Sequence, residues 1–204
     1  MIHIVDYGLG NIRALLNVYR RLNIQAQTAG SADALRGATH VILPGVGHFD
    51  HAMDRLQASG MREPLDELVR DAQVPVLGIC VGMQILAASS EEGTRQGLGW
   101  INARVRAFSG WEPTKSLPMP HMGWNDVTPR ATHPLFAKMD GDRRFYFLHS
   151  YFFECQHPED VLAESEYGAP FSCAVRRGNV MGVQFHPEKS HHFGTRLLQN
   201  FAEL

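Results

Sequence analysis

Cys80 stands between two glycines in the segment Gly78-Ile79-Cys80-Val81-Gly82, directly after the apolar run Val74-Pro75-Val76-Leu77. A nucleophile with a glycine two residues away on each side is typical of a nucleophile elbow, a sharp turn between a strand and a helix. Such a turn presents the nucleophile at the edge of a sheet, and glycine permits the close backbone approach on both flanks. Because the central residue is cysteine, the pattern predicts thiolate attack on an acyl group.

A thiolate nucleophile needs a proton donor for its leaving group, and the best candidate is His186. It follows an apolar strand that ends near Val183, so we expect it to project from the same sheet edge as Cys80. Glu188, two residues further on, can accept a hydrogen bond from the imidazole and fix its tautomer. The sequence therefore predicts a catalytic triad of Cys80, His186 and Glu188. A buried structural cysteine and an ordinary surface or core histidine are the alternative interpretations.

Acyl transfer also requires donors for the developing oxyanion. The backbone N–H of Val81, immediately after the nucleophile, is the usual first donor. The segment Pro44-Gly45-Val46-Gly47 follows the third expected strand, and its glycines permit a backbone conformation that aims an N–H at the active centre. We therefore assign Val81, Val46 and Gly47 to the oxyanion site, although the second segment could equally be a simple strand-ending turn.

The elements that must position these residues alternate along the first half of the chain. Hydrophobic patterning predicts strands at residues 2–7, 24–28, 40–43 and 74–79. It predicts helices over residues 12–22, 32–36, 49–58 and 62–71, the first of them capped by Asn11. Strands that alternate with helices at these spacings are typical of a parallel sheet covered by helices on both faces.

The second half of the chain differs, because residues 101–183 form short β-like runs separated by turn residues. We expect these runs to add antiparallel strands to the parallel sheet. A closing helix would place Phe193, Leu197, Leu198 and Phe201 on one face. The predicted fold class is thus α/β: an open, mostly parallel sheet flanked by helices, with added antiparallel strands, in a single domain over residues 1–204.

Bulk properties exclude several other classes of protein. The 204 residues carry a formal net charge of -2, which gives no electrostatic reason to expect nucleic acid or an anionic membrane as a partner. No apolar stretch approaches the roughly 20 residues of a membrane span, and the N-terminus resembles a strand and not a signal peptide. Three cysteines without paired spacing make a disulfide framework improbable, so we expect a cytoplasmic protein.

Two weak motifs carry no cofactor prediction. Gly8-Leu9-Gly10 lacks the third glycine of a dinucleotide fingerprint, because Arg13 stands at that position. His191-His192 lies near His186, but no cysteine or carboxylate at suitable spacing supports a metal site. We therefore expect neither a metal nor another cofactor.

Taken together, the motifs resemble those of the class I glutamine amidotransferases, over essentially the whole chain. Residues 78–84 resemble the nucleophile segment of that family, and His186-Pro187-Glu188 resembles its His-x-Glu pair. The resemblance implies a flavodoxin-like core and a glutaminase activity, in which Cys80 attacks the side-chain amide of L-glutamine and His186 protonates the departing ammonia. It further implies substrate-binding roles for Gln84, Glu92, Ser150 and Tyr151.

Four further segments narrow the resemblance within this class. They are Asp6-Tyr7-Gly8-Leu9-Gly10-Asn11, Pro44-Gly45-Val46-Gly47-His48-Phe49, His121-Met122-Gly123-Trp124-Asn125 and His149-Ser150-Tyr151. They are similar to segments of the glutaminase subunits of imidazole glycerol phosphate synthases, from histidine biosynthesis. That resemblance implies a heterodimer with a (β/α)₈-barrel cyclase subunit, to which the ammonia passes.

It also places Asn11, Trp124 and Lys189 at the contact with that subunit. A helix cap, a partly buried aromatic residue and a solvated lysine are the structural alternatives for these three positions. The resemblance further implies that the segment from Pro44 to Gly47 is inactive until the partner is engaged.

Three other functions remain open at this stage. A glutaminase that serves another synthase, such as pyridoxal phosphate synthase, would carry a Pro-Gly-Gly turn where this chain has Pro44-Gly45-Val46-Gly47. A cysteine peptidase or related hydrolase would act on peptides and not on glutamine. A binding subunit with a vestigial elbow is disfavoured by the intact Cys80, His186 and Glu188.

Overall fold

A computed structural model describes all residues from 1 to 204. An 11-stranded mixed sheet organises the fold, and five adjacent strands at one end of it are parallel. In spatial order these five are β2 (Ala26–Ala29), β1 (Ile2–Val5), β3 (His40–Gly45), β4 (Val76–Cys80) and β13 (Val180–Val183). All residues of β1, β4 and β13 are buried, as expected for strands covered on both faces.

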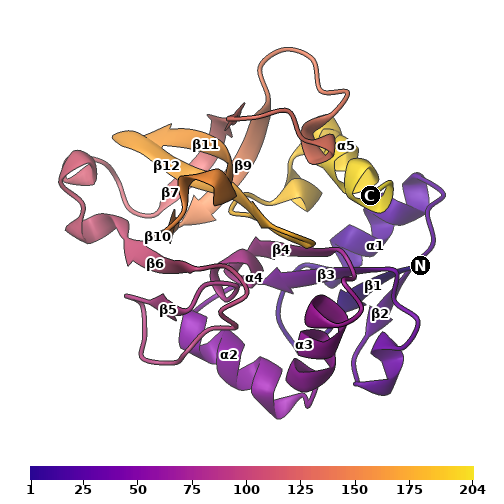
Figure 1. The fold of residues 1–204 in the computed structure, drawn as a ribbon. Helices are drawn as coiled ribbons and strands as arrows, with labels where there is room; N and C mark the ends of the chain where they lie inside the picture. Colours follow the sequence, from indigo (N-terminus) through magenta and orange to yellow (C-terminus); the bar gives the residue numbers. More distant parts are fainter.

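Helices cover both faces of this parallel part (Figure 1). α1 (Ile12–Arg21) and α5 (His191–Ala202) lie on one face, and α2 (Phe49–Ala58) and α3 (Arg62–Arg70) lie on the other. α4 (Val81–Gln84) directly follows β4 and is a single turn. Short 3₁₀ helices occur at Asp33–Leu35, Phe108–Gly110, Glu112–Thr114, Pro134–Phe136, Pro158–Asp160 and Pro187–Lys189.

The second half of the chain adds the antiparallel strands that the sequence predicts. β12 (Ala169–Arg177) runs antiparallel to β13, and the sheet continues through β10 (Tyr151–Cys155), β6 (Ala103–Ala107) and β5 (Ser89–Ser90). β11 (Val161–Tyr167) pairs with β12 and with β8 (Thr128–Pro129). A separate two-stranded sheet joins β7 (His121–Asp126) to β9 (Arg144–His149). The predicted fold class is confirmed.

The helices form because their apolar residues recur at helical spacing and face one core. In α1 the buried residues are Leu15, Val18 and Tyr19. In α5, Leu197, Leu198 and Phe201 are buried and Phe193 is partly buried, which confirms the predicted face. These side chains belong to one cluster of 57 buried residues that extends through both halves of the chain.

Several local features differ from the sequence-based expectations. β1 covers Ile2–Val5, β2 covers Ala26–Ala29 and β4 covers Val76–Cys80, where strands are predicted at 2–7, 24–28 and 74–79. Residues 33–35 form one 3₁₀ turn, where a short α-helix is predicted over 32–36. β3 does not end before Pro44 but continues to Gly45, where it pairs with β4 alone because β1 pairs only as far as Ile42. Asn11 occupies the N-cap position of α1, but its side chain makes no capping hydrogen bond. It contacts Glu188 instead.

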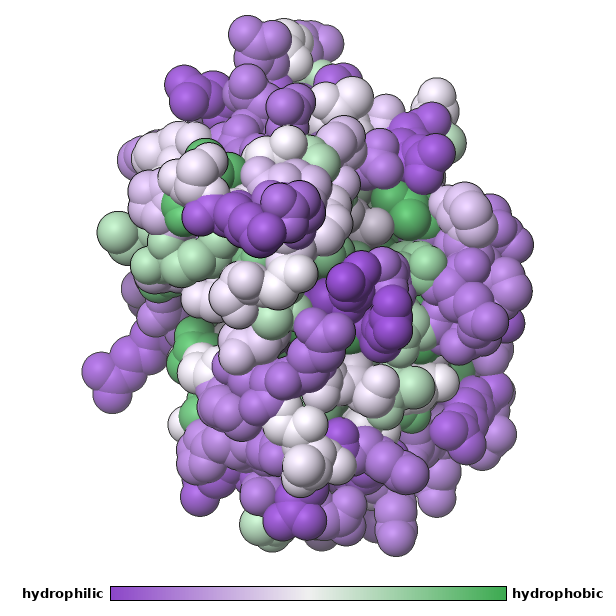
Figure 2. All heavy atoms as spheres, turned by 90° about the vertical axis from the view of Figure 1, so that its left-hand side faces the viewer, coloured by the Kyte–Doolittle hydropathy of each residue, from purple (hydrophilic) through white to green (hydrophobic).

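One face of the molecule is mainly polar. Figure 2 views the left-hand side of Figure 1 and shows mainly hydrophilic residues there, with apolar side chains in small groups between them. None of the helices combines the length and apolar character that a membrane span requires.

Candidate active site

The parallel strands β3, β4 and β13 bring the predicted catalytic residues to one edge of the sheet. β3 and β4 are aligned so that Gly45 lies opposite Cys80, and β13 and β4 so that Val183 lies opposite Ile79. The residues that follow Gly45 and Val183 therefore meet Cys80 at the carboxyl ends of the strands. This is the edge where open α/β sheets bind their ligands.

The backbone at Cys80 has the strained conformation of a nucleophile elbow. Its φ is +54° and its ψ is −114°, which a residue with a side chain rarely adopts. A Cβ at Gly82 would lie 1.8 Å from the carbonyl oxygen of Leu43, and one at Gly78 would lie 2.6 Å from the carbonyl oxygen of Gly82. Glycine is required at Gly82 because β3 passes directly against it, and at Gly78 because the backbone of the following helical turn does.

Replacing Gly82 with alanine should destabilise the protein by about 3 kcal/mol or more, since a methyl group there collides with fixed backbone. Thermal or denaturant unfolding measures this loss. Gly110→Ala is the matched control, because nothing lies within 4 Å of a Cβ at that position, and it should change stability by less than about 0.5 kcal/mol. Equal stability of the two variants would contradict the close packing of the elbow.

The predicted triad is assembled at this edge. The Nδ1 atom of His186 lies 2.9 Å from Oε1 of Glu188, and only 5% and 2% of the two side chains are exposed. Cys80 is buried, and its Sγ lies 3.9 Å from the carbonyl oxygen of Leu148. Because Glu188 engages Nδ1, the other ring nitrogen of His186 is available to the thiol of Cys80.

Burial alone would lower the pKa of His186, but its interactions with Cys80 and Glu188 raise this pKa to about 10. Burial would likewise raise the pKa of Glu188, but the hydrogen bond and charge of His186 bring it below its ordinary value. The site thus favours a protonated imidazolium on His186, paired with the carboxylate of Glu188, at neutral pH.

This pKa predicts a pH profile. The protonated form of His186 is stabilised in the folded protein, so its contribution to stability is complete below 6.5, the ordinary value, and is lost as the pH rises through about 10. The kcat/KM for glutamate production should therefore have its alkaline limb near pH 10. Steady-state assays from about pH 6 to 11 measure this. An alkaline limb near pH 6.5, the value of an unperturbed histidine, would contradict the ion pair.

Asn11 contacts the triad instead of capping its helix. Its Nδ2 donates to Oε1 of Glu188 at 3.3 Å, the same oxygen that pairs with His186. The expectation that Asn11 caps α1 is therefore wrong, because the side chain is drawn toward a buried carboxylate. The other carboxylate oxygen of Glu188 is buried and has no partner.

A cavity of about 280 Å³ opens beside Cys80. It is lined by all three residues assigned to the oxyanion site, by Cys80 and His186, and by the four residues assigned to substrate binding. These are Val46, Gly47, Val81, Gln84, Glu92, Ser150 and Tyr151, together with Pro120, Leu148, His149 and Lys189. Glu188 does not reach this cavity and lies behind His186, as the orienting member of a triad should.

Gln84 is held by two hydrogen bonds and points into a buried network. Its Nε2 donates to the carbonyl oxygen of Tyr151 at 3.3 Å and to Oε1 of Gln184 at 3.1 Å. Gln184 in turn donates from Nε2 to Sγ of Cys80 at 3.8 Å. A donor to the sulfur stabilises a thiolate, so Gln184 belongs to the site, although the sequence-based reasoning missed it. Its position two residues before His186, directly after the strand beside β4, was the available signal.

Glu92 connects the cavity to the start of α2. Its Oε2 accepts a hydrogen bond from the backbone N–H of Phe49 at 2.7 Å, just after the segment that carries Val46 and Gly47. Its own N–H donates to Oγ of Ser90 at 3.0 Å. The carboxylate of Glu92 thus lines the cavity and fixes the start of α2 beside the segment of Val46 and Gly47.

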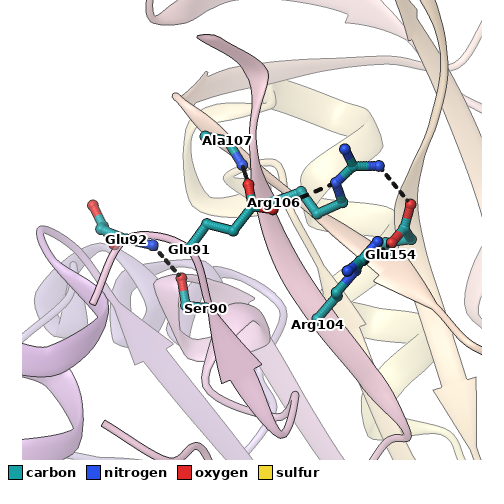
Figure 3. Close-up of polar contacts among 7 residues, drawn as sticks. All are labelled: Ser90, Glu91, Glu92, Arg104, Arg106, Ala107 and Glu154. Carbon is teal, nitrogen blue, oxygen red and sulfur yellow. Dashed lines mark hydrogen bonds and ion pairs between the residues drawn. The ribbon is translucent and has the colours of Figure 1, made fainter. Parts of the chain in front are cut away.

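The neighbouring residue Glu91 anchors this loop to the sheet (Figure 3). Its Oε2 accepts from the N–H of Ala107 at 2.8 Å, and its Oε1 lies 3.7 Å from Nε of Arg106. Arg106 and Arg104 both pair with Glu154 of β10, at 3.0 and 2.6 Å. The loop that carries Glu92 is thus bonded to β6, and β6 is in turn bonded to β10.

Of the three predicted contact residues, Lys189 lines the cavity, Trp124 lies on β7, and Asn11 contacts Glu188 behind the cavity. Lys189 lines the cavity and places its Nζ 5.7 Å from the ring centre of Tyr146. Trp124 is 40% exposed and stacks on His191 with ring centres 5.0 Å apart. Other exposed large apolar side chains include Val46 and Leu148, which line the cavity, and Met122, which lies opposite Leu148 in the pairing of β7 and β9. Exposed apolar side chains beside a cavity are typical of a protein contact.

Comparison with known proteins places this site in a family. The family model for "Glutamine amidotransferase class-I" matches residues 3–204. The chain belongs to the class I glutamine amidotransferases. Among curated class I glutamine amidotransferases, it is 60% identical to imidazole glycerol phosphate synthase subunit HisH of Bdellovibrio bacteriovorus and 50% identical to that of Leptospira interrogans, each over 100% of both chains.

Solved structures support the amidotransferase fold independently. The chain superimposes on a crystal structure of a glutamine amidotransferase with a TM-score of 0.77 at 22% identity, over 99% of this chain and 97% of the other. At that identity the likeness establishes the fold alone.

Proposed function

We propose that this chain is a glutaminase that hydrolyses L-glutamine to L-glutamate and ammonia. The observation that carries the proposal is Cys80 on a strained elbow, beside a cavity that also holds His186 backed by Glu188. The 60% identity to a HisH subunit over the whole chain supports it.

The reaction follows from the geometry in two steps. The thiolate of Cys80 attacks the side-chain amide carbon of glutamine, and a C–S bond forms. When the tetrahedral intermediate collapses, the C–N bond breaks and His186 gives its proton to the departing ammonia. Water then attacks the γ-glutamyl thioester while His186 accepts a proton, which releases glutamate and restores the thiolate. Glu188 holds the imidazole in position through both steps.

The oxyanion of each tetrahedral intermediate would be bound by backbone N–H groups of Val81 and of Val46 or Gly47, all of which line the cavity. Gln84, Glu92, Ser150 and Tyr151 would hold the glutamine, with the carboxylate of Glu92 facing its ammonium group. No metal or other cofactor is needed for this chemistry.

The ammonia would pass to a cyclase. Relatives that are 60% and 50% identical are named as subunits of imidazole glycerol phosphate synthase, so we propose a heterodimer with the (β/α)₈-barrel cyclase subunit of that enzyme in histidine biosynthesis. The cyclase reaction that consumes the ammonia, which is the lyase activity of the enzyme, would belong to that partner. Asn11, Trp124 and Lys189, with the exposed apolar residues near the cavity, would form the contact. We place the pair in the cytoplasm and assign all of residues 1–204 to one amidotransferase domain.

Partner contact should also activate the glutaminase. The oxyanion segment is held from one side, where the hydroxyl of Tyr7 donates to the carbonyl oxygen of Pro44 at 2.7 Å. On its other side Val46 is 39% exposed and Gly47 has a φ of +91°, which leaves this segment open to a docking protein. The resemblance to imidazole glycerol phosphate synthase glutaminases implies that this segment is inactive until the partner docks, so the isolated chain should be a poor glutaminase.

The test is glutamate production by the chain alone and with the cyclase and its ligand. We expect a rise of at least about tenfold on addition of the partner, a coupling of about 1.4 kcal/mol. Equal rates would contradict the activation but not the triad. Activity on peptides and none on glutamine would instead favour a cysteine hydrolase.

A further inference from the structure

A buried pair of histidines behind the cavity takes no part in the chemistry described above. His149 lines the cavity and His121 lies directly behind it, and they are 6% and 4% exposed. Nδ1 of His121 is 2.9 Å from Nε2 of His149. Aromatic rings surround both histidines, at centre-to-centre distances of 4.9 to 6.4 Å from Phe108, Phe147 and Phe171.

The groups that bond to the two histidines fix the direction of each hydrogen bond between them. The carbonyl oxygen of Tyr151 can only accept, so Nδ1 of His149 donates to it at 2.8 Å. In a neutral ring the Nε2 atom of His149 is then an acceptor, and Nδ1 of His121 must be the donor. Nε2 of His121 is left as an acceptor and receives Nδ2 of Asn125 at 3.2 Å, while Asn125 also donates to the carbonyl oxygen of Glu166 at 2.8 Å.

Both rings are neutral at physiological pH. Burial lowers the pKa of His121 to about 4, and burial together with the neighbouring His121 lowers the pKa of His149 to about 3. Every polar atom of the two rings has one partner of the correct kind. The two tautomers are therefore locked, with the proton on Nδ1 in each ring.

This chain of bonds ends at the segment proposed to clamp the substrate. The Tyr151 carbonyl that His149 holds is the same carbonyl that receives Nε2 of Gln84 at 3.3 Å. Leu148, one residue before His149, places its carbonyl oxygen 3.9 Å from Sγ of Cys80. His121 is thus linked through His149 to the backbone of the segment 148–151.

We propose that His121 is a positioning residue for glutamine binding. It acts through His149, whose locked tautomer keeps the backbone of Ser150 and Tyr151 in the binding conformation. His121 lies opposite His149 in the register of β7 and β9, so the pairing of these strands sets the donor in place. The inference rests on the proposed glutaminase function for its kinetic consequence but not for its spectroscopic one.

Two variants of His121 distinguish the effect of its N–H donor from the effect of its ring volume. His121→Leu removes the donor and leaves Nε2 of His149 buried without a partner. His121→Asn keeps an N–H at the position of Nδ1. Because an unsatisfied buried group is costly, the KM for glutamine should rise about tenfold in the leucine variant, with kcat within about threefold of the parent. The asparagine variant should restore most of that loss.

A matched control tests whether any buried histidine would give the same result. His133 is also buried, and its Nδ1 accepts from the backbone N–H of Leu135, but it does not line the cavity. His133→Leu should leave the KM for glutamine unchanged. All kinetic measurements use the complex with the cyclase.

Nitrogen-15 NMR of the histidine side chains supplies a readout independent of activity. We expect the proton of His149 on Nδ1 in the parent and in both variants, because the Tyr151 carbonyl fixes it. The nitrogen-15 shift of the acceptor Nε2 of His149 should change in His121→Leu, where its donor is lost, and should stay near the parent value in His121→Asn. Nε2-protonated His149 in the parent, or an equal rise in KM for both variants, would overturn the proposal. A parent complex that makes no glutamate would refute the glutaminase function, while the tautomer result would still decide the locked pair.

Discussion

Cys80→Ala should abolish glutamine-dependent turnover, with a loss of about 10⁴-fold or more, because no other group in the cavity can form the thioester. The alanine side chain fits wherever the cysteine does, so the fold should be preserved. Glutamate release by the complex, followed over time, measures the loss.

The same variant should keep the cyclase reaction when ammonium salt replaces glutamine, since that chemistry lies in the partner. Cys155→Ala is the matched cysteine control. Burial raises the pKa of Cys155 to about 12, so its thiol is inert at neutral pH, and its loss should leave glutamine use intact. If Cys80→Ala also lost the ammonia-dependent reaction, Cys80 would matter for folding or docking and not only for chemistry.

His186→Ala should produce the second largest loss, also about 10⁴-fold or more in kcat, because both proton transfers lose their donor and acceptor. Glu188→Gln should cost less, by at least about tenfold, since the amide still contacts the ring but supplies no charge. Single-turnover assays with saturating glutamine compare the two. An equal or greater loss in Glu188→Gln would show that the carboxylate, not the imidazole, governs the site.

The pH profile separates these roles further. Because Glu188 helps to raise the pKa of His186, the Glu188→Gln variant should lose activity at a lower pH than the parent on the alkaline side. The His186→Ala variant should have no alkaline limb of this origin. An unchanged limb in Glu188→Gln would mean that the charge of Glu188 does not reach the imidazole.

Much of this site could be predicted because its signals are local in sequence. The elbow requires glycines at fixed distances from Cys80, and the steric reason is visible in the contacts of Gly78 and Gly82 with neighbouring backbone. His186 and Glu188 are separated by a single residue, so their pairing needs only one turn of chain. The alternation of strands and helices in the first half similarly reflects local periodicity.

The parts that could not be predicted depend on contacts between distant segments. Asn11 looks like a helix cap, but its Nδ2 donates to the carboxylate of Glu188, 177 positions away along the chain, and its side chain makes no capping hydrogen bond. Gln184 and His149 reach the site only because β13 and β9 lie beside it. Their side-chain types alone give no sign of a role, since buried glutamine and histidine residues are common in cores.

The single measurement that tests the central claim is covalent trapping of Cys80 by a diazo-ketone analogue of glutamine in the complex with the cyclase. We predict one adduct, located on the Cys80 peptide by mass spectrometry, with simultaneous loss of glutaminase activity and protection by excess glutamine. A Cys80 thiol that stays unmodified with the partner bound, or an adduct on Cys155 or Cys173 instead, would contradict the assignment of Cys80 as the nucleophile.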